Sequence, residues 1–255
     1  MTSVLFSFFL LPLASAPLAA TYVASTSMVT QAKEETPKPK KATDKKKTEK
    51  KADFRAVDDE KMKLLKTLDS TFQTKALSMK VDKTTKIPIL EQEKKSSGKM
   101  FVANGRLRLE LDGTEKSLLV VNKKNLWAVT FPGAEFKDAP VQVIKGDTSS
   151  KKGRSSNFVS LLAQGGFLKF FTATGSQAQP NGDVLIFLAP KKDTTDFKRA
   201  QVKVSADGEK ITGLNYWDDR DNETRFEFSD VKVESKLEDK LFQYAPPANA
   251  DIMTL

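Results

Sequence analysis

Residues 107–131 decide the fold class, because they contain three short apolar segments in close succession. These segments are Leu107-Arg-Leu-Glu-Leu111, Ser117-Leu-Leu-Val-Val-Asn122 and Asn125-Leu-Trp-Ala-Val-Thr-Phe131. Apolar residues alternate with other residues in the first, which is the period of a strand with one buried face. The connections are too short for a helical crossover, so neighbouring strands should be antiparallel. The sequence therefore predicts an antiparallel sheet here.

The same pattern extends the sheet in both directions along the chain. Leu77, Met79 and Val81 alternate with polar residues before this region, and Asp207-Gly208 is a strong hairpin signal after it. We expect ten or eleven antiparallel strands in a meander. The further segments that show the pattern are 99–102, 183–189, 199–205, 210–217 and 223–231.

Two segments have helical periodicity instead. Over about 58–76, Asp58 and Asp59 are suited to cap a helix, and apolar residues then recur at spacings of three and four. Over 155–164, Ser155 or Ser156 should cap a second helix, which Gly165-Gly166 should end. The fold class is therefore α+β and mainly antiparallel: an incomplete, open β-barrel covered on its concave side by two or three helices.

The first fifty residues differ in composition from the rest. Residues 1–32 are apolar, are interrupted by prolines and end in small residues, which predicts a secretory signal peptide; an uncleaved anchor is the alternative. Residues 33–53 are rich in Lys and Pro and predict a disordered linker. The folded domain should therefore comprise residues 54–255.

The composition restricts the chemistry of the protein. The chain has no Cys and no His, which rules out Cys–His and Ser-His-Asp catalytic arrangements and His/Cys zinc sites. Between residues 33 and 51 there are nine Lys and four acidic residues, so this segment carries more than half of the formal net charge of +9. With no recognition motif elsewhere, we expect no nucleic-acid partner, and likewise no metal, no cofactor and a monomeric chain.

Four segments together resemble the outer-membrane lipoprotein carrier protein family (LolA). The run from Phe228 to Ala250, with Leu241-Phe-Gln-Tyr244 and Pro246-Pro247, is similar to the closing segment of that family. Ser97–Phe101 resembles its Ser-Gly strand entry, Leu118–Trp127 resembles its central hairpin, and Asn157–Phe167 resembles its second helix. The four occur in the family's order and cover about 95–250.

The resemblance implies a non-enzymatic carrier in the periplasm. Such a carrier would bind the acyl chains of lipoproteins and move them from the inner to the outer membrane. Its implied partners are acylated lipoproteins, an inner-membrane lipoprotein-releasing ABC transporter and an outer-membrane lipoprotein acceptor. The alternatives are a carrier of another lipid on the same fold, an envelope lipid or lipoprotein sensor and, from a different class, an envelope enzyme that uses a carboxylate pair.

The strand pattern also predicts where acyl chains would bind. If the sheet is wider than its helices can fill, its apolar residues line a cavity; if not, they form an ordinary core. The expected cavity residues are Leu107, Leu109, Leu119, Val121, Trp127, Val129 and Phe131. The apolar helix residues would compete with lipid as a lid: Met62, Leu65, Leu68, Phe72, Phe158, Leu161 and Leu162.

One departure from the family concerns how the lid is held. Family members carry a Lys-Arg-Pro tripeptide after the Ser-Gly strand, and its Arg is implied to latch the lid through backbone carbonyls. Here that place reads Ala103-Asn104-Gly105. The candidates that remain for a latch are Asn104, Arg106 and Arg108, with the two arginines on a shared face of their strand.

Overall fold

A computed structural model of the chain describes residues 54–136, 138–150, 158–164, 167–191 and 197–255. The expected signal peptide (1–32) and linker (33–53) lie outside these residues, and so do the expected cap at Ser155 or Ser156 and the Gly165-Gly166 stop.

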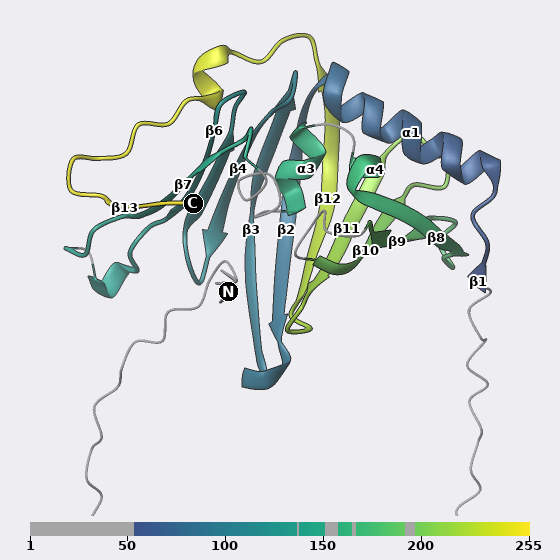
Figure 1. Cartoon of the computed structure of the whole chain (residues 1–255), viewed down its shortest axis with the longest axis horizontal. Helices are drawn as coiled ribbons and strands as arrows, with labels where there is room; N and C mark the ends of the chain where they lie inside the picture. Colours follow the sequence, from purple (N-terminus) through teal and green to yellow (C-terminus); the bar gives the residue numbers. More distant parts are fainter. Residues whose placement is uncertain (1–53, 137, 151–157, 165–166, 192–196) are drawn as a thin grey trace, which may run out of the picture. The chain divides into compact units, whose positions relative to one another are not determined.

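In the described part of the chain, thirteen strands form one strongly curved, open sheet (Figure 1). The strands are β1 (Phe54–Arg55), β2 (Ala76–Ile87), β3 (Gln92–Ala103), β4 (Arg106–Gly113), β5 (Ser117–Val121), β6 (Asn125–Thr130), β7 (Gln142–Asp147), β8 (Phe171–Ala178), β9 (Val184–Pro190), β10 (Phe197–Val204), β11 (Ile211–Asp218), β12 (Glu223–Glu234) and β13 (Asp251–Thr254).

The strand order is β1-β8-β9-β10-β11-β12-β2-β3-β4-β5-β6-β7-β13. The expected α+β open barrel is therefore confirmed, but the sheet has more strands than expected and is not one simple meander. Two meanders, β2–β7 and β8–β12, meet where β12 pairs with β2. The strands that the pattern missed, β1, β7, β8 and β13, are short or rich in small and polar residues, as in Thr172-Ala-Thr-Gly-Ser-Gln177 of β8.

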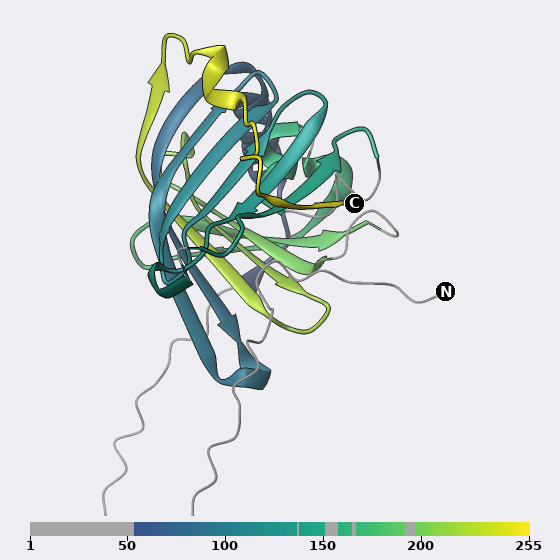
Figure 2. The same ribbon diagram turned by 90° about the vertical axis from the view of Figure 1, so that its left-hand side faces the viewer.

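All neighbouring strands are antiparallel except the last pair, because β13 runs parallel to β7. The chain reaches β13 by crossing the outside of the sheet after β12 (Figure 2). That crossing includes the short 3-10 helix η3 (Asp239–Phe242), and two others are η1 (Pro88–Leu90) and η2 (Ala134–Phe136).

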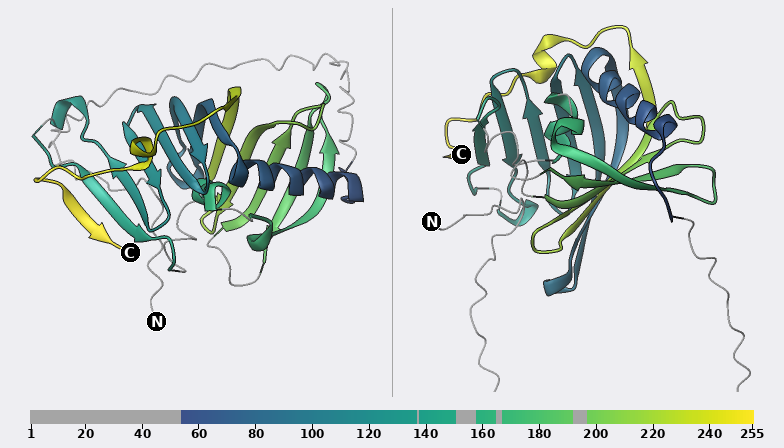
Figure 3. Two further views of the ribbon diagram at one scale, coloured as in Figure 1. Left: turned by 90° about the horizontal axis from the view of Figure 1, so that it is seen from above. Right: turned by 45° about the vertical axis from the view of Figure 1, so that its right-hand side comes forward.

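The helices lie on the concave side of the sheet (Figure 3). They are α1 (Asp59–Thr74), α3 (Phe158–Gln164) and α4 (Phe167–Phe170), and α1 approaches both of the others. Asp58 caps α1 as expected: its carboxylate accepts a hydrogen bond of 2.9 Å from the backbone N–H of Lys61. Leu65 and Phe72 of α1 are buried, as the helical periodicity predicts.

Two glycines allow the sheet to form where the sequence pattern suggested it. A Cβ on Gly98 would lie 1.8 Å from the carbonyl oxygen of Glu110, so only glycine lets β3 approach β4 this closely. Gly208 has a φ of +74° in the turn between β10 and β11, which confirms the hairpin expected at Asp207-Gly208.

Candidate functional site

Four of the seven expected cavity residues lie together on the concave, helix-covered face of the sheet. Leu107 is directly opposite Val121, and Leu109 is directly opposite Leu119, across the β4–β5 pair. Directly paired residues project from the same face of a sheet. All four side chains are buried, with 0–6% of their surface exposed.

This inner face continues over most of the sheet as one apolar surface. The strand registers place on it buried residues from β2, β3, β6, β9, β10, β11 and β12. The residues are Leu77, Met79, Val81, Met100, Val102, Leu126, Ala128, Ile186, Leu188, Ala200, Val202, Leu214, Phe226 and Phe228. Each has 0–7% of its surface exposed, so in this structure the face is covered.

The expected lid residues supply part of this cover. Leu65 and Phe72 of α1 and Phe158, Leu161 and Leu162 of α3 are all buried, with at most 3% exposed. Met62 is partly buried, and the side chain of Leu68 lies outside the described part of the chain. The structure therefore brings the two helices together over the inner face.

Phe158 of α3 is fully buried and packs against several aromatic rings. Its ring stacks on Tyr216 with 5.0 Å between centroids and 12° between planes. The centroids of Phe171 and Phe197 lie 5.0 and 5.2 Å from it. Tyr216 projects from the inner face of β11, and burial raises the pKa of its hydroxyl to about 12. Phe158 thus anchors α3 in an aromatic cluster against the sheet.

The other three expected cavity residues lie on the opposite, outer face. Trp127 pairs with Val120, and Val129 pairs with Leu118, one residue out of step with Leu119 and Val121. They belong to a second apolar cluster, with Phe131 packed against it, and Tyr244 and Ala250 cover that cluster. β5 is apolar on both faces, so its sequence does not reveal which neighbours share a face.

Two of the three latch candidates, Arg106 and Arg108, lie on the outer face. The Arg106 guanidinium lies 4.6 Å from the ring centroid of Phe242 and makes a 2.7 Å ion pair with Asp239. Arg108 donates a 3.2 Å hydrogen bond to the carbonyl oxygen of Leu241. Asn104 is exposed in the β3–β4 turn with a φ of +51°. The two arginines therefore hold the C-terminal segment, including η3, on the outer face, opposite to the face that α1 and α3 cover.

Sequence reasoning missed one polar group on the inner face. Lys83 follows Leu77, Met79 and Val81 in the same alternation and is opposite Phe226 of β12. Burial lowers the pKa of Lys83 to about 8, despite the carboxylate of Glu115 nearby. Lys94, which makes a 2.9 Å ion pair with Glu115, lies beside it. The alternation of β2 was the signal that placed Lys83 on this face.

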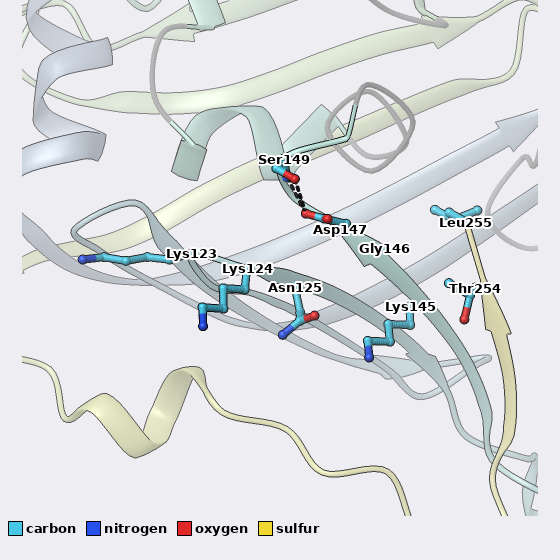
Figure 4. Close-up of a pocket in the computed structure, with 9 residues that line it drawn as sticks. All are labelled: Lys123, Lys124, Asn125, Lys145, Gly146, Asp147, Ser149, Thr254 and Leu255. Atoms are coloured by element: carbon cyan, nitrogen blue, oxygen red, sulfur yellow. Dashed lines mark hydrogen bonds between the residues drawn. The ribbon is translucent and has the colours of Figure 1, made fainter.

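A polar pocket of about 460 Å³ lies elsewhere, beside the β5–β6 turn, the end of β7 and the chain's C-terminus (Figure 4). Its lining residues are Lys123, Lys124, Asn125, Lys145, Gly146, Asp147, Ser149, Thr254 and Leu255. Hydrogen bonds from the Ser149 hydroxyl and backbone N–H lower the pKa of Asp147. Three lysines in so small a lining do not suit hydrocarbon.

Two other kinds of site are absent from the part of the chain that the structure describes. No group of three or more Asp or Glu side chains there is arranged to hold a metal ion. No helix there is both long and apolar enough to cross a bilayer.

Comparisons with a family model and with known proteins point to the same family. The family model of the outer membrane lipoprotein carrier protein LolA matches residues 88–245. An outer-membrane lipoprotein carrier protein of Coxiella burnetii is 26% identical over 160 residues, which are 60% of this chain and 68% of that protein. One of Methylococcus capsulatus is 32% identical over 76 residues, only 30% of this chain and 36% of that protein.

Solved structures also resemble the chain. A LolA superfamily protein from Nitrosomonas europaea is 11% identical, with a TM-score of 0.39 over 72% of this chain and 97% of that one.

Proposed function

The chain belongs to the outer membrane lipoprotein carrier protein LolA family, and from this premise we propose that it is a periplasmic carrier that holds lipoprotein acyl chains against the inner face of its sheet. One observation carries the proposal: a continuous apolar face, spread over nine strands, lies beneath short helices. Acyl chains would reach that face by displacing α1 and α3 and taking their place.

The energies of the two occupants are comparable, which favours reversible binding. Five lid side chains are fully buried, and each contributes about 1.5–3 kcal/mol, so the lid gains roughly 8–15 kcal/mol by closing. An acyl chain that buries about a dozen methylenes gains roughly 10 kcal/mol. Because the free energies of lid closure and of lipid binding differ little, either state can be populated. Lipid enters when the lid opens and leaves when the lid closes.

A membrane-release assay tests the proposal. The purified full chain and ATP are mixed with inner-membrane vesicles that contain an acylated lipoprotein and the ABC transporter, and the soluble fraction is assayed for a complex. The control lipoprotein carries Ser in place of its acylated Cys. We expect the protein to solubilise the acylated form alone. Release of neither form, or equal capture of both, would refute a carrier function.

The remaining parts of the proposal follow from the family. The leader within residues 1–32 directs the chain to the periplasm, an ABC transporter loads it, and an outer-membrane acceptor unloads it. The carrier is monomeric and catalyses no reaction. Sequencing the N-terminus of the protein isolated from the periplasm tests export, and cross-linking in intact cells tests the two partners.

Lys83 favours a second candidate function, in which the protein carries a different lipid that has an anionic headgroup. This lysine projects from the inner face beside Lys94, where a phosphate group at the end of an acyl chain would meet positive charge. Mass spectrometry of lipid that co-purifies with the chain separates the two candidates. A phospholipid or glycolipid in place of a lipoprotein would favour this one.

A further inference from the structure

The β2–β3 hairpin exposes two large apolar residues at its tip. Ile89 has 88% of its surface exposed and Leu90 has 44%, and both belong to the 3-10 turn η1 that joins the strands. Of the large apolar side chains in the described residues, Ile89 is the most exposed. Single exposed apolar residues are common on the surfaces of soluble proteins. Two adjacent ones at the tip of a projecting hairpin are unusual and indicate an interaction site.

The hairpin holds this tip firmly and away from the rest of the sheet. β2 and β3 stay paired up to Ile87 and Gln92, and the backbone N–H of Glu91 closes the turn with a 3.1 Å hydrogen bond to the Pro88 carbonyl oxygen. On one side β4 ends opposite Ser96, so the first four residues of β3 have no paired strand there. Figures 1 and 2 show the hairpin projecting beyond the other strands.

Lysines flank the tip, together with a similar number of glutamates. Lys86, Lys94 and Lys95 lie near it beside Glu91 and Glu93, and Lys94 makes a 2.9 Å ion pair with Glu115. Lys95 has 75% of its side chain exposed and Lys86 has 47%, and both pair with Glu93, at 3.0 and 3.8 Å. Such exposed pairs are weak, so the lysine ammonium groups can exchange a carboxylate partner for a lipid phosphate. An apolar point flanked by long lysine side chains matches the acyl and phosphate layers of a bilayer.

We propose that the β2–β3 hairpin docks the protein on a membrane surface, with Ile89 and Leu90 entering the acyl region and the flanking lysines contacting lipid phosphates. A protein partner fits these observations less well, because a stable protein interface buries about 800 Å² per partner and needs a matching surface. A narrow convex tip with two apolar side chains is smaller than that, whereas a fluid bilayer needs no preformed pocket. The docking site is separate from the inner face and does not depend on acyl binding there.

The test follows the position of the tip directly. Because the chain has no Cys, Ile89→Cys in the full chain gives a single site for the environment-sensitive dye NBD. Glu209→Cys, at the exposed β10–β11 turn, is the matched site. Vesicles of phosphatidylethanolamine and phosphatidylglycerol, some with spin-labelled acyl chains, are added. We expect a blue shift and quenching at position 89 and neither at position 209.

Vesicle sedimentation separates the tip from the Lys-rich segment 33–53, which also attracts anionic lipid. Ile89→Ser with Leu90→Ser should weaken binding by at least about tenfold. Ile252→Ser with Met253→Ser, which removes two other exposed apolar side chains, should leave it unchanged.

Uptake of an acyl probe by the inner face should be the same in both double variants, which keeps this proposal apart from the carrier function. A dye at position 89 that stays in water while the protein is bound to vesicles would overturn the proposal. So would a dye that shifts only when another protein is added.

Discussion

Phe158→Ala should increase the affinity of the protein for acyl chains while it destabilises the fold. Phe158 is fully buried and touches Phe171, Phe197 and Tyr216, so it contributes to the closed lid and to little else. Truncating a buried Phe to Ala costs about 3–5 kcal/mol. If lipid must displace Phe158 to bind, the wild-type protein loses this energy on binding lipid. The Phe158→Ala variant does not.

The size of the effect follows from the lid equilibrium. Apparent affinity is the intrinsic affinity multiplied by the fraction of open protein. A loss of about 3 kcal/mol from the closed state raises that fraction by about two orders of magnitude, since 1.4 kcal/mol is tenfold. That gain is a ceiling, because Phe158 also makes some contact with bound lipid.

The assay pairs a titration with an unfolding curve. A fluorescent acyl probe gives the affinity, and urea unfolding gives the stability. Phe242→Ala is the matched control: Phe242 is 1% exposed but lies on the outer face under Arg106. We expect both variants to lose stability and only Phe158→Ala to bind the probe more tightly. Unchanged or weaker binding by a folded Phe158→Ala protein would refute a competing lid.

Three further predictions concern other parts of the molecule. Trp127 and Trp217 both lie on the outer face, so brominated acyl chains bound inside should not quench tryptophan fluorescence; strong quenching would place the lipid elsewhere. Burial depresses the pKa of Lys83 from 10.5 to about 8, so the folded state disfavours its charge; Lys83→Met should raise the urea midpoint at pH 7, and the difference from wild type should shrink between pH 8 and 10.5. Arg106 lowers the pKa of Asp239, so their pairing stabilises the C-terminal segment above pH 3.8 and is lost as the pH falls below it; the protection of residues 239–244 from hydrogen exchange, relative to the intrinsic rate at each pH, should fall there, and Arg106→Gln should weaken that pH dependence.

The sequence was sufficient for the fold wherever one period dominated. Strict alternation in 107–111 predicted that Leu107 and Leu109 share one face, which is the inner face in the structure, and the spacing of three and four identified α1 and its cap. The sequence was not sufficient to assign residues to the inner or outer face where both faces of a strand are apolar. In β5, Leu118 and Leu119 are equally buried on opposite faces, so nothing local assigns Trp127 or Val129 to a side.

The outer cluster could not be foreseen for a second reason. It exists because a segment more than a hundred residues later, around Tyr244, folds back across β5 and β6. The same long-range contact redirects Arg106 and Arg108 from the lid to the C-terminal segment. Short strands such as β13, with four residues, likewise depend on a neighbour that only the tertiary fold supplies.

The most direct test of the account uses two adjacent residues that face opposite ways. A photoreactive benzoylphenylalanine at Leu119 projects to the inner face, and the same group at Leu118 projects to the outer face, although the two leucines are similarly buried at 6% and 7% exposed. Each variant is loaded with an acylated lipoprotein and irradiated. We expect a cross-link to the acyl chains from position 119 and none from position 118. Cross-linking from position 118 alone would contradict it.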